Sequence, residues 1–150
     1  MNLTLAAPRR RNRGFTLIDL LISLAIVAIL VRIALPNYQA YIVKSSRQAV
    51  QGELVALANL QEKIFLNSSS YTSSMTAAYT GQSTGGLGLP AASSPTTSGK
   101  SKDGRYTIAV TATATTFTLT ATPKAGTPQA GDGNLTINEA GIRAWGSKVW

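Results

Sequence analysis

The sequence contains no cysteine and no histidine among its 150 residues. A disulfide and a thiolate metal site are therefore impossible, and the two side chains most used in catalysis and metal binding are missing. The six acidic residues are scattered and form no evident catalytic pair. The three acids that would have to build a calcium site, Asp103, Asp132 and Glu139, lack a ligand-dense loop. We therefore expect a protein that is not an enzyme and that carries no cofactor and no metal.

Positive charge is unevenly spread along the chain. Fourteen basic and six acidic residues give a formal net charge of +8. Four of the basic residues, Arg9, Arg10, Arg11 and Arg13, lie in one short N-terminal block, and the remainder of the chain carries only +4. The overall charge therefore overstates how basic the rest of the protein is.

A long apolar segment follows this basic block. Residues 15–35 contain only two charged side chains, Asp19 and Arg32. A helix of this length, rising about 1.5 Å per residue, crosses a hydrocarbon core of about 30 Å. The basic residues before it predict a cytoplasmic N-terminus, and Arg32 lies near the far end, where its long side chain can reach the membrane surface. We expect a single pass through an inner membrane.

Pro36 interrupts this segment, and a proline either kinks a helix or ends it. The following residues favour a kink, because 37–66 contain no further proline and show helical periodicity. Polar residues such as Gln61 fall largely off the apolar stripe. A single helix over residues 15–66 would be about 78 Å long, too long for a compact domain of this size, so part of it must project. The stripe consists of Val43, Val50, Leu54, Leu57, Ile64 and Phe65.

The remainder of the chain predicts an irregular loop and then a small sheet. Residues 67–104 are rich in Ser, Thr, Gly, Ala and Pro, as is typical of a loop. Alternating apolar and polar residues predict strands at 106–113, at 117–121 and at 135–137, followed by a mostly irregular tail. Three strands alone are marginal, so the amphipathic helix must pack on them. The expected fold is α+β, one long N-terminal helix on an antiparallel sheet of three or four strands. Its segments are a basic leader (1–14), a hydrophobic helix half (15–36), an amphipathic helix half (37–66), a loop (67–104) and the sheet with its tail (105–150).

The junction between the basic block and the apolar segment resembles the class III signal of type IV pilins. The resemblance rests on the run from Gly14 to Asp19 (GFTLID), the apolar residues after it and Pro36. It implies that a prepilin peptidase cuts between Gly14 and Phe15 and that the new N-terminal Phe15 is N-methylated. It also implies the pilin fold and a pilus outside the cell. The implied partners are other pilin subunits, the peptidase and methyltransferase, the inner-membrane assembly platform and, before assembly, membrane lipid.

Two other N-terminal interpretations stay open, an uncleaved membrane anchor and an ordinary secretory signal. No convincing A-x-A cleavage site follows the apolar run, which argues against the secretory signal.

The C-terminal part is similar to PilE-like minor type IV pilins. The similarity rests on residues 117–123, on residues 133–141 and on Trp150. Such pilins usually bracket the last segment with a disulfide, and Asp132 and Val149 stand here where the resemblance places the two cysteines. The acid near the new N-terminus is also Asp19 instead of the usual glutamate.

Asp19 needs a physical explanation because it lies inside the apolar segment. A carboxylate at the centre of a membrane costs about 2.5–3.5 kcal/mol, and the helix dipole returns only about 0.3–1 kcal/mol to an acid in the first turn. A cationic partner would offset the remainder. The pilin resemblance implies that this partner is the amine of Phe15 on a neighbouring subunit, which makes Asp19 an assembly residue.

These observations favour a structural subunit of a type IV pilus, a minor pilin serving assembly, adhesion or twitching motility. One alternative is a pseudopilin of type II secretion. The other is a pilus-borne module that binds DNA or surfaces, with Lys100, Lys102 and Arg105 contacting phosphates. A basic cluster in a Ser/Gly-rich loop is more often a solvated surface, so nucleic acid is the less favoured partner. Trp145 and Trp150 are expected to pack the tail onto the sheet.

Overall fold

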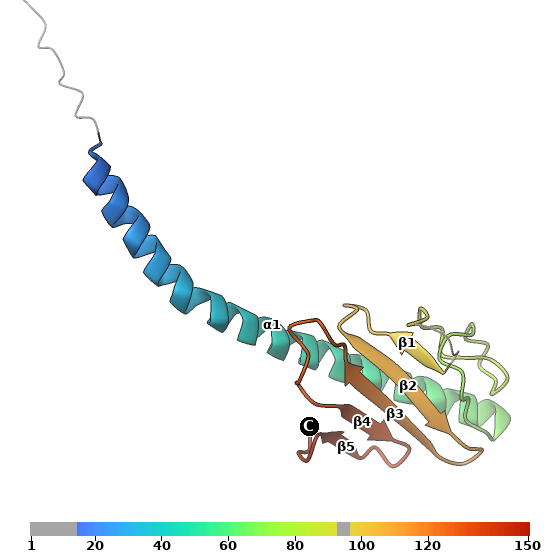
Figure 1. Ribbon diagram of the computed structural model, residues 1–150. Coiled ribbons are helices and arrows are strands. Elements are labelled where there is room, and N and C mark those ends of the chain that lie inside the picture. Colours follow the sequence, from blue (N-terminus) through green and yellow to red (C-terminus); the bar gives the residue numbers. More distant parts are fainter. Residues whose placement is uncertain (1–14, 93–96) are drawn as a thin grey trace, which may run out of the picture. The chain divides into compact units, whose positions relative to one another are not determined.

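The computed structural model describes residues 15–92 and 97–150, which form one helix and five strands (Figure 1). They fall into two units, one ending at Tyr38 and the other running from Gln39 to Trp150. The expected α+β fold, with a long N-terminal helix and an antiparallel sheet, is confirmed. The elements are α1 (Leu17–Ser68), β1 (Ser98–Lys100), β2 (Tyr106–Ala112), β3 (Phe117–Pro123), β4 (Leu135–Asn138) and β5 (Arg143–Trp145).

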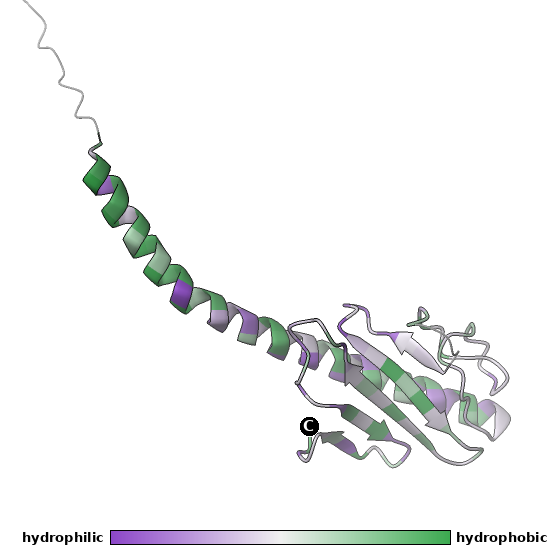
Figure 2. Ribbon diagram, viewed as in Figure 1, coloured by the Kyte–Doolittle hydropathy of each residue, from purple (hydrophilic) through white to green (hydrophobic). Residues whose placement is uncertain are grey.

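In the first unit, α1 is an apolar helix with no buried residue. Every residue from 15 to 41 is exposed, including Leu30 at 60% and Ile33 at 61%. Figure 2 shows that hydrophobic residues line nearly the whole of this stretch. The helix is long and apolar enough to cross a membrane. Pro36 lies inside α1, so the helix does not end there; the bend expected at Pro36 stays a prediction.

The second unit holds the sheet, whose strands are all antiparallel and follow chain order from β1 to β5. The sheet has two short edge strands in addition to the three that alternation predicts. Strand β1, a Ser-Gly-Lys stretch, has no apolar alternation and pairs with β2 at Gly99 and Ile108. Strand β5 lies in the tail expected to be irregular and pairs with β4 at Leu135 and Trp145.

The core lies between the second half of α1 and one face of the sheet. From the predicted stripe, Val50, Leu54, Leu57 and Ile64 are buried, and Val43 and Phe65 are half-buried. Each fully buried aliphatic side chain contributes about 1.5–3 kcal/mol, so this docking stabilises both layers. The sheet contributes Tyr106, Ile108, Val110, Phe117, Leu119, Ala121, Leu135 and Ile137.

The loop between α1 and β1 also enters the core, which its composition conceals. Its Tyr71 ring stacks on Phe65, with 4.7 Å between centroids, and meets Phe117 edge-on at 4.8 Å. Gln61 is buried, against the expectation that it lies off the stripe. Its amide donates to the Thr72 carbonyl at 2.7 Å and accepts from the Thr72 N–H at 3.1 Å. Because both of its polar groups are paired, the burial of Gln61 carries little cost.

Glycine permits a close backbone approach within this loop. The N–H of Gly86 donates to Ala78 at 3.0 Å, and the N–H of Leu87 donates to Ser74 at 3.0 Å. A Cβ atom at Gly86 would lie 2.5 Å from the carbonyl oxygen of Ala77. The glycines that mark this segment as irregular are therefore the residues that let it fold back on itself.

Candidate functional site

The predicted processing site is only partly within the described residues. Gly14 lies outside them, and Phe15, which begins them, is 86% exposed. Asp19 lies in the first turn of α1.

Asp19 and Thr16 form a reciprocal cap at the start of α1. The Thr16 hydroxyl donates to Asp19 Oδ2 at 2.7 Å and the Thr16 N–H donates to the same oxygen at 3.2 Å. The Asp19 N–H in turn donates to the Thr16 hydroxyl oxygen at 3.3 Å. This is the capping-box arrangement, and the spacing Thr-x-x-Asp before an apolar run is its sequence signature, which our sequence analysis did not use. Asp19 Oδ1 accepts no hydrogen bond from any residue in 15–92 or 97–150.

The three basic residues proposed from sequence as DNA contacts lie at one end of the sheet. Lys100 ends β1, and Lys102 and Arg105 lie in the connection to β2. Strand pairing places further basic residues at the same end, since β3 ends opposite the start of β2 and β5 ends opposite the start of β4. Lys124 directly follows β3, and its N–H donates to the Arg105 carbonyl at 2.8 Å. Lys148 follows β5, and its carbonyl accepts the Trp145 N–H.

Helix α1 adds two more basic residues at this end. The Gln129 amide donates to the Val43 carbonyl at 3.2 Å, and Arg47 pairs with Asp132. Seven of the nine basic residues between 39 and 150 therefore lie together; Lys63 and Arg143 lie elsewhere. We call this set the basic end, and it consists of Lys44, Arg47, Lys100, Lys102, Arg105, Lys124 and Lys148. All five of its lysines are exposed.

Asp103, one of three acids at or beside the basic end, is held by internal hydrogen bonds. It accepts from the hydroxyls of Ser46 and Ser101 and, at 3.0 Å, from the Arg105 N–H. Burial by itself raises the pKa of Asp103, but these bonds and the Arg105 charge outweigh burial and hold the pKa below its ordinary value. The carboxylate is thus turned toward its own chain instead of opposing an incoming anion.

Asp132, a second acid, is bonded to α1, to β2 and to the segment between β3 and β4. Its side chain is 4% exposed and accepts from Arg47 Nε at 2.8 Å and from the Tyr106 hydroxyl at 2.7 Å. Gln129 donates to it at 2.6 Å. Burial raises the pKa of Asp132, but the hydrogen bonds from Arg47, Tyr106 and Gln129 and the Arg47 charge lower it further than burial raises it. Burial and the neighbouring Asp132 together raise the pKa of Tyr106.

This cluster fastens the C-terminal segment, for which the resemblance implies a disulfide. The indole N–H of Trp145 donates to the Asp132 carbonyl, and the Arg47 guanidinium lies 3.7 Å from the Trp145 ring centre. The indole N–H of Trp150 donates to the Ala144 carbonyl at 2.9 Å. The C-terminal segment is therefore fastened to α1 and β2 through residue 132, where the resemblance places a cysteine. Val149, at the other expected cysteine position, is 85% exposed.

The acids considered for calcium do not converge. Glu139 accepts the Phe117 N–H at the opposite end of the sheet from Asp103 and Asp132. Across residues 15–92 and 97–150, no group of three or more acidic side chains is arranged to hold a metal ion.

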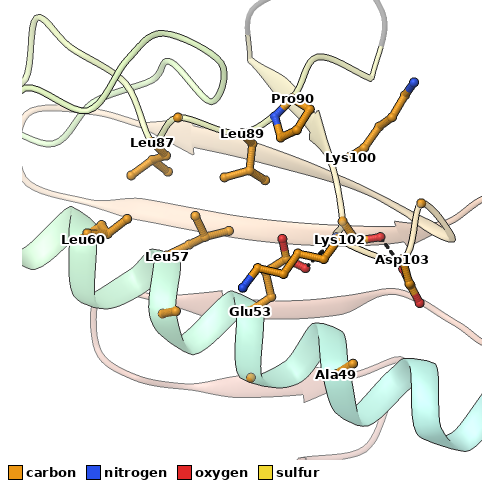
Figure 3. A pocket seen from close by; sticks show the side chains of 15 residues that line it. Ala49, Glu53, Leu57, Leu60, Leu87, Leu89, Pro90, Lys100, Lys102 and Asp103 are labelled. Carbon is orange, nitrogen blue, oxygen red and sulfur yellow. Dashed lines mark hydrogen bonds between the residues drawn. The ribbon is translucent and has the colours of Figure 1, made fainter.

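A groove of about 770 Å³ lies beside the basic end, between α1, residues 87–90 and residues 100–104 (Figure 3). Leu57, Leu60 and Leu89 are among its apolar lining. Lys100 points away from the groove, whereas Lys102 extends along it above Glu53. Glu53 accepts the Lys102 N–H at 3.2 Å, and burial raises its pKa. With apolar walls and a carboxylate inside, the groove is less suited to phosphate than the open basic end.

Comparison with known proteins gives two family matches. Residues 9–34 match the prokaryotic N-terminal methylation motif. Residues 36–136 match the family described as type IV minor pilin ComP, DNA uptake sequence receptor.

Individual relatives match mainly over the N-terminal part. The type IV major alpha-pilin of Moraxella bovis is 59% identical over 45 residues, which is 30% of this chain and 28% of that protein. The type IV major pilin protein PilA of Myxococcus xanthus is 40% identical over 62 residues, 41% of this chain and 28% of that protein. A fimbrial protein of Pseudomonas aeruginosa is 37% identical over 67 residues, 45% of this chain and 44% of that protein. The chain thus spans less than half the length of each of these relatives.

The second family match covers more than half of the chain and includes most of the sheet. It also includes all of the residues that fasten Asp132 to α1 and β2, and six of the seven members of the basic end. With the methylation motif before it, this match distinguishes a pilus subunit from the other N-terminal interpretations. The chain belongs to the type IV minor pilin ComP family.

Proposed function

We propose that this protein is a minor pilin that binds double-stranded DNA at its basic end. The observation that carries the proposal is the gathering of seven basic residues at one end of the sheet, with the three nearby acids, Asp103, Asp132 and Glu53, engaged by their own chain. The family description, which names a DNA uptake sequence receptor, supports the same ligand. The sequence alone disfavours nucleic acid, because a basic cluster in a Ser/Gly-rich loop is more often a solvated surface, and strand pairing and α1 add the other four basic residues.

The dimensions of the basic end suit a duplex. Five strands spaced about 4.8 Å apart make a row about 19 Å wide, which exceeds the width of about 6 Å of the DNA minor groove. Lysines along such a row reach phosphates on both sides of that groove. Contacts of this kind supply most of the affinity and set the orientation of the DNA, but they do not read its sequence.

The test compares two charge-neutralised variants of the full chain in detergent micelles. Lys100→Gln, Lys102→Gln and Lys124→Gln together remove three charges from the basic end, and the control, Lys63→Gln with Arg143→Gln, removes two charges elsewhere. Fluorescence anisotropy with a labelled duplex at about 0.1 M salt should show binding weakened on the order of 100-fold in the first variant, because each lysine–phosphate contact releases close to one counterion. The control should change about twofold or less. Equal losses of DNA affinity in the two variants would show that the basic end is not the DNA-binding site.

We propose that the N-terminal segment serves assembly into the pilus. The chain is then inserted in the inner membrane with a cytoplasmic N-terminus, cut between Gly14 and Phe15 and methylated at Phe15. Its partners are a prepilin peptidase, the assembly platform and other pilin subunits. Mass spectrometry of the chain from sheared pili should find methylated Phe15 as the first residue. An intact Met1, or a first residue well beyond Phe15, would overturn this part.

We further propose that Asp19 binds the amine of Phe15 on a neighbouring subunit. Asp19→Ala should insert in the membrane as the natural chain does but be missing from pili, as judged by immunoblots of the two fractions. Thr16→Val is the control because it removes the hydroxyl that caps the helix and keeps the carboxylate. Normal incorporation of the alanine variant would contradict this role.

A further inference from the structure

The basic end of the sheet lies beside the part of α1 that follows the apolar run. Within the second unit, the Val43 carbonyl accepts the Gln129 amide at 3.2 Å, which holds this end of the sheet against the first turns of the helix there. Leu35 ends the apolar run, and Lys44 follows it after nine residues, or about 14 Å of helix. The lysines are therefore carried by the end of the sheet that is nearest to the membrane span along the chain.

This short separation brings the basic end within range of lipid headgroups. Residues 15–35 fill a hydrocarbon core of about 30 Å, and the headgroup layer extends about 5–7 Å beyond that core on each side. Headgroup charges act over a further distance set by the Debye length, which is about 8 Å at physiological ionic strength. Together these distances amount to about 13–15 Å, so the field of an anionic membrane extends as far as Lys44.

Two exposed tyrosines indicate where the membrane surface lies along the chain. Tyr38 is 63% exposed and Tyr41 is 69% exposed, and both lie between Leu35 and Lys44. Tyrosine is enriched at membrane–water interfaces, because its ring is apolar and its hydroxyl stays hydrated. The positions of the two tyrosines therefore indicate that the headgroup layer directly precedes the basic end.

The charge of the basic end is available to this layer. Its five lysines are exposed, whereas Glu53, Asp103 and Asp132 are bonded to their own chain. At the other end of the sheet, the connection between β2 and β3, residues 113–116, carries no charge. An anionic surface is therefore attracted to one end of the second unit.

We propose that, before assembly, the basic end binds the anionic phospholipid headgroups of the membrane that holds α1. Each lysine close to such a surface favours the bound state about fivefold. Because α1 keeps the domain at the membrane, weak contacts suffice. A lysine that binds a headgroup phosphate is not free for DNA, so a subunit in the membrane is withheld from DNA and its transfer to a pilus frees the site. The lipid contact rests on the membrane-insertion part of the proposed function, and its consequence for DNA rests on the DNA-binding part.

Energy transfer from a fluorophore on the domain to labelled headgroups measures the contact. Because the chain has no cysteine, Ala125→Cys at the basic end and Ala114→Cys at the other end each attach one fluorophore to an exposed position. Strands of seven residues separate the two positions by about 23 Å.

The full chain is compared in vesicles of phosphatidylcholine alone and in vesicles with about 30% phosphatidylglycerol. Transfer from Ala125→Cys should increase at least twofold in the anionic vesicles, and about 0.5 M salt should abolish the increase. Transfer from Ala114→Cys should not increase. No increase at Ala125→Cys, or equal increases at the two positions, would overturn the inference.

A matched pair of variants in the Ala125→Cys background tests the charge. Lys44→Gln with Lys102→Gln removes two charges from the basic end and should lower the ratio of membrane-bound to unbound domains about 25-fold. Lys63→Gln with Arg143→Gln removes two charges elsewhere and should lower this ratio about twofold or less. Equal losses in the two pairs would contradict the contact. A chain that does not float with vesicles in a density gradient contradicts membrane insertion itself, whereas a chain that floats without increased transfer contradicts only this inference.

An excess of a short duplex tests the competition with DNA. It should return the transfer from Ala125→Cys in anionic vesicles to the value in neutral vesicles, because the same lysines serve both ligands. A duplex that binds the chain in detergent micelles but leaves this transfer unchanged would show that the membrane does not withhold the site from DNA. Failure to bind in micelles would instead contradict the DNA-binding proposal.

Discussion

The two parts of α1 use their apolar surface in opposite ways. Between Leu17 and Tyr38 no residue is buried within the chain, whereas from Ser46 onward one stripe is buried against the sheet and the loop. A helix that is apolar on all sides needs lipid or other helices around it, and one with a single apolar face needs only its own domain. The difference shows that the first part depends on other molecules and the second on its own fold.

Charge follows the same division. The described part of the first unit has one acid and one base, 13 residues apart, and each has an exposed side chain. The second unit has nine basic residues, of which seven gather at one end of the sheet around three internally bonded acids. The second pattern suits a polyanion.

The largest expected effect comes from breaking the cluster that fastens the C-terminal segment. Asp132→Ala should lower the free energy of unfolding by about 3–5 kcal/mol, because it leaves Arg47 half-buried without its carboxylate. Urea unfolding of the full chain in detergent, followed by tryptophan fluorescence, measures this change. Asp19→Asn, in the other part of the helix, should leave the transition midpoint in place. If the two variants lowered the free energy of unfolding equally, the conclusion that only the second part of α1 depends on its own domain would be wrong.

A second pair of variants compares the same side chain in the two parts of α1. Leu54→Ala removes a side chain that is 0% exposed and should cost about 2–5 kcal/mol of unfolding free energy. Leu30 is 60% exposed, and Leu30→Ala should not change the unfolding of the domain. The same urea titration serves for both variants. A loss above about 1 kcal/mol in Leu30→Ala would mean that the domain also uses the first part for its stability.

A smaller effect is expected from acid. The pKa values of Asp103 and Asp132 are lower in the folded protein than the ordinary value of 3.8. Their ionised forms therefore stabilise the fold above that value, and the stabilisation is lost as the pH falls through the lowered folded-state values. Unfolding free energy should vary little between about pH 5 and 7 and decrease below about pH 4. Asp132→Asn should flatten this decrease; an identical acid profile in that variant would rule out Asp132 as its source.

The smallest expected effect is at the start of α1. Thr16→Ala removes the cap shared with Asp19 and should destabilise the first turn by about 1 kcal/mol. Hydrogen exchange of the amides at 17–20 should accelerate about fivefold while exchange in the sheet stays unchanged, since the cost is local. Unchanged exchange in the first turn would show that the cap contributes nothing there.

Much of the fold follows from the sequence because its main elements are long and periodic. Residues 106, 108 and 110 and the stripe around Leu54 show their burial through spacing alone. Strand β1 and Gln61 do not, because pairing with β2 and hydrogen bonding to Thr72 create their environments. Composition likewise conceals Met75, which is buried although its neighbours are polar.

The sequence alone predicts only part of the candidate site. Lys100, Lys102 and Arg105 are neighbours along the chain, but Lys44, Lys124 and Lys148 join them only through the order and direction of the strands. In an antiparallel sheet the end of one strand lies beside the start of its neighbour. This rule needs no knowledge of side chains, and it could have placed Lys124 beside Arg105 from the sequence. The pairing of Arg47 with Asp132 left no periodic signal, because it joins residues 85 positions apart.

The most direct measurement of the central claim, that one end of the sheet binds the DNA backbone, is the salt dependence of binding. With five exposed lysines engaged, the logarithm of the association constant of the full chain for a duplex should fall with the logarithm of salt concentration with a slope of about −4.5. The slope should weaken by about 2.7 in the variant lacking Lys100, Lys102 and Lys124, and stay unchanged in the Lys63 and Arg143 control. The same slope in all three proteins would contradict the account.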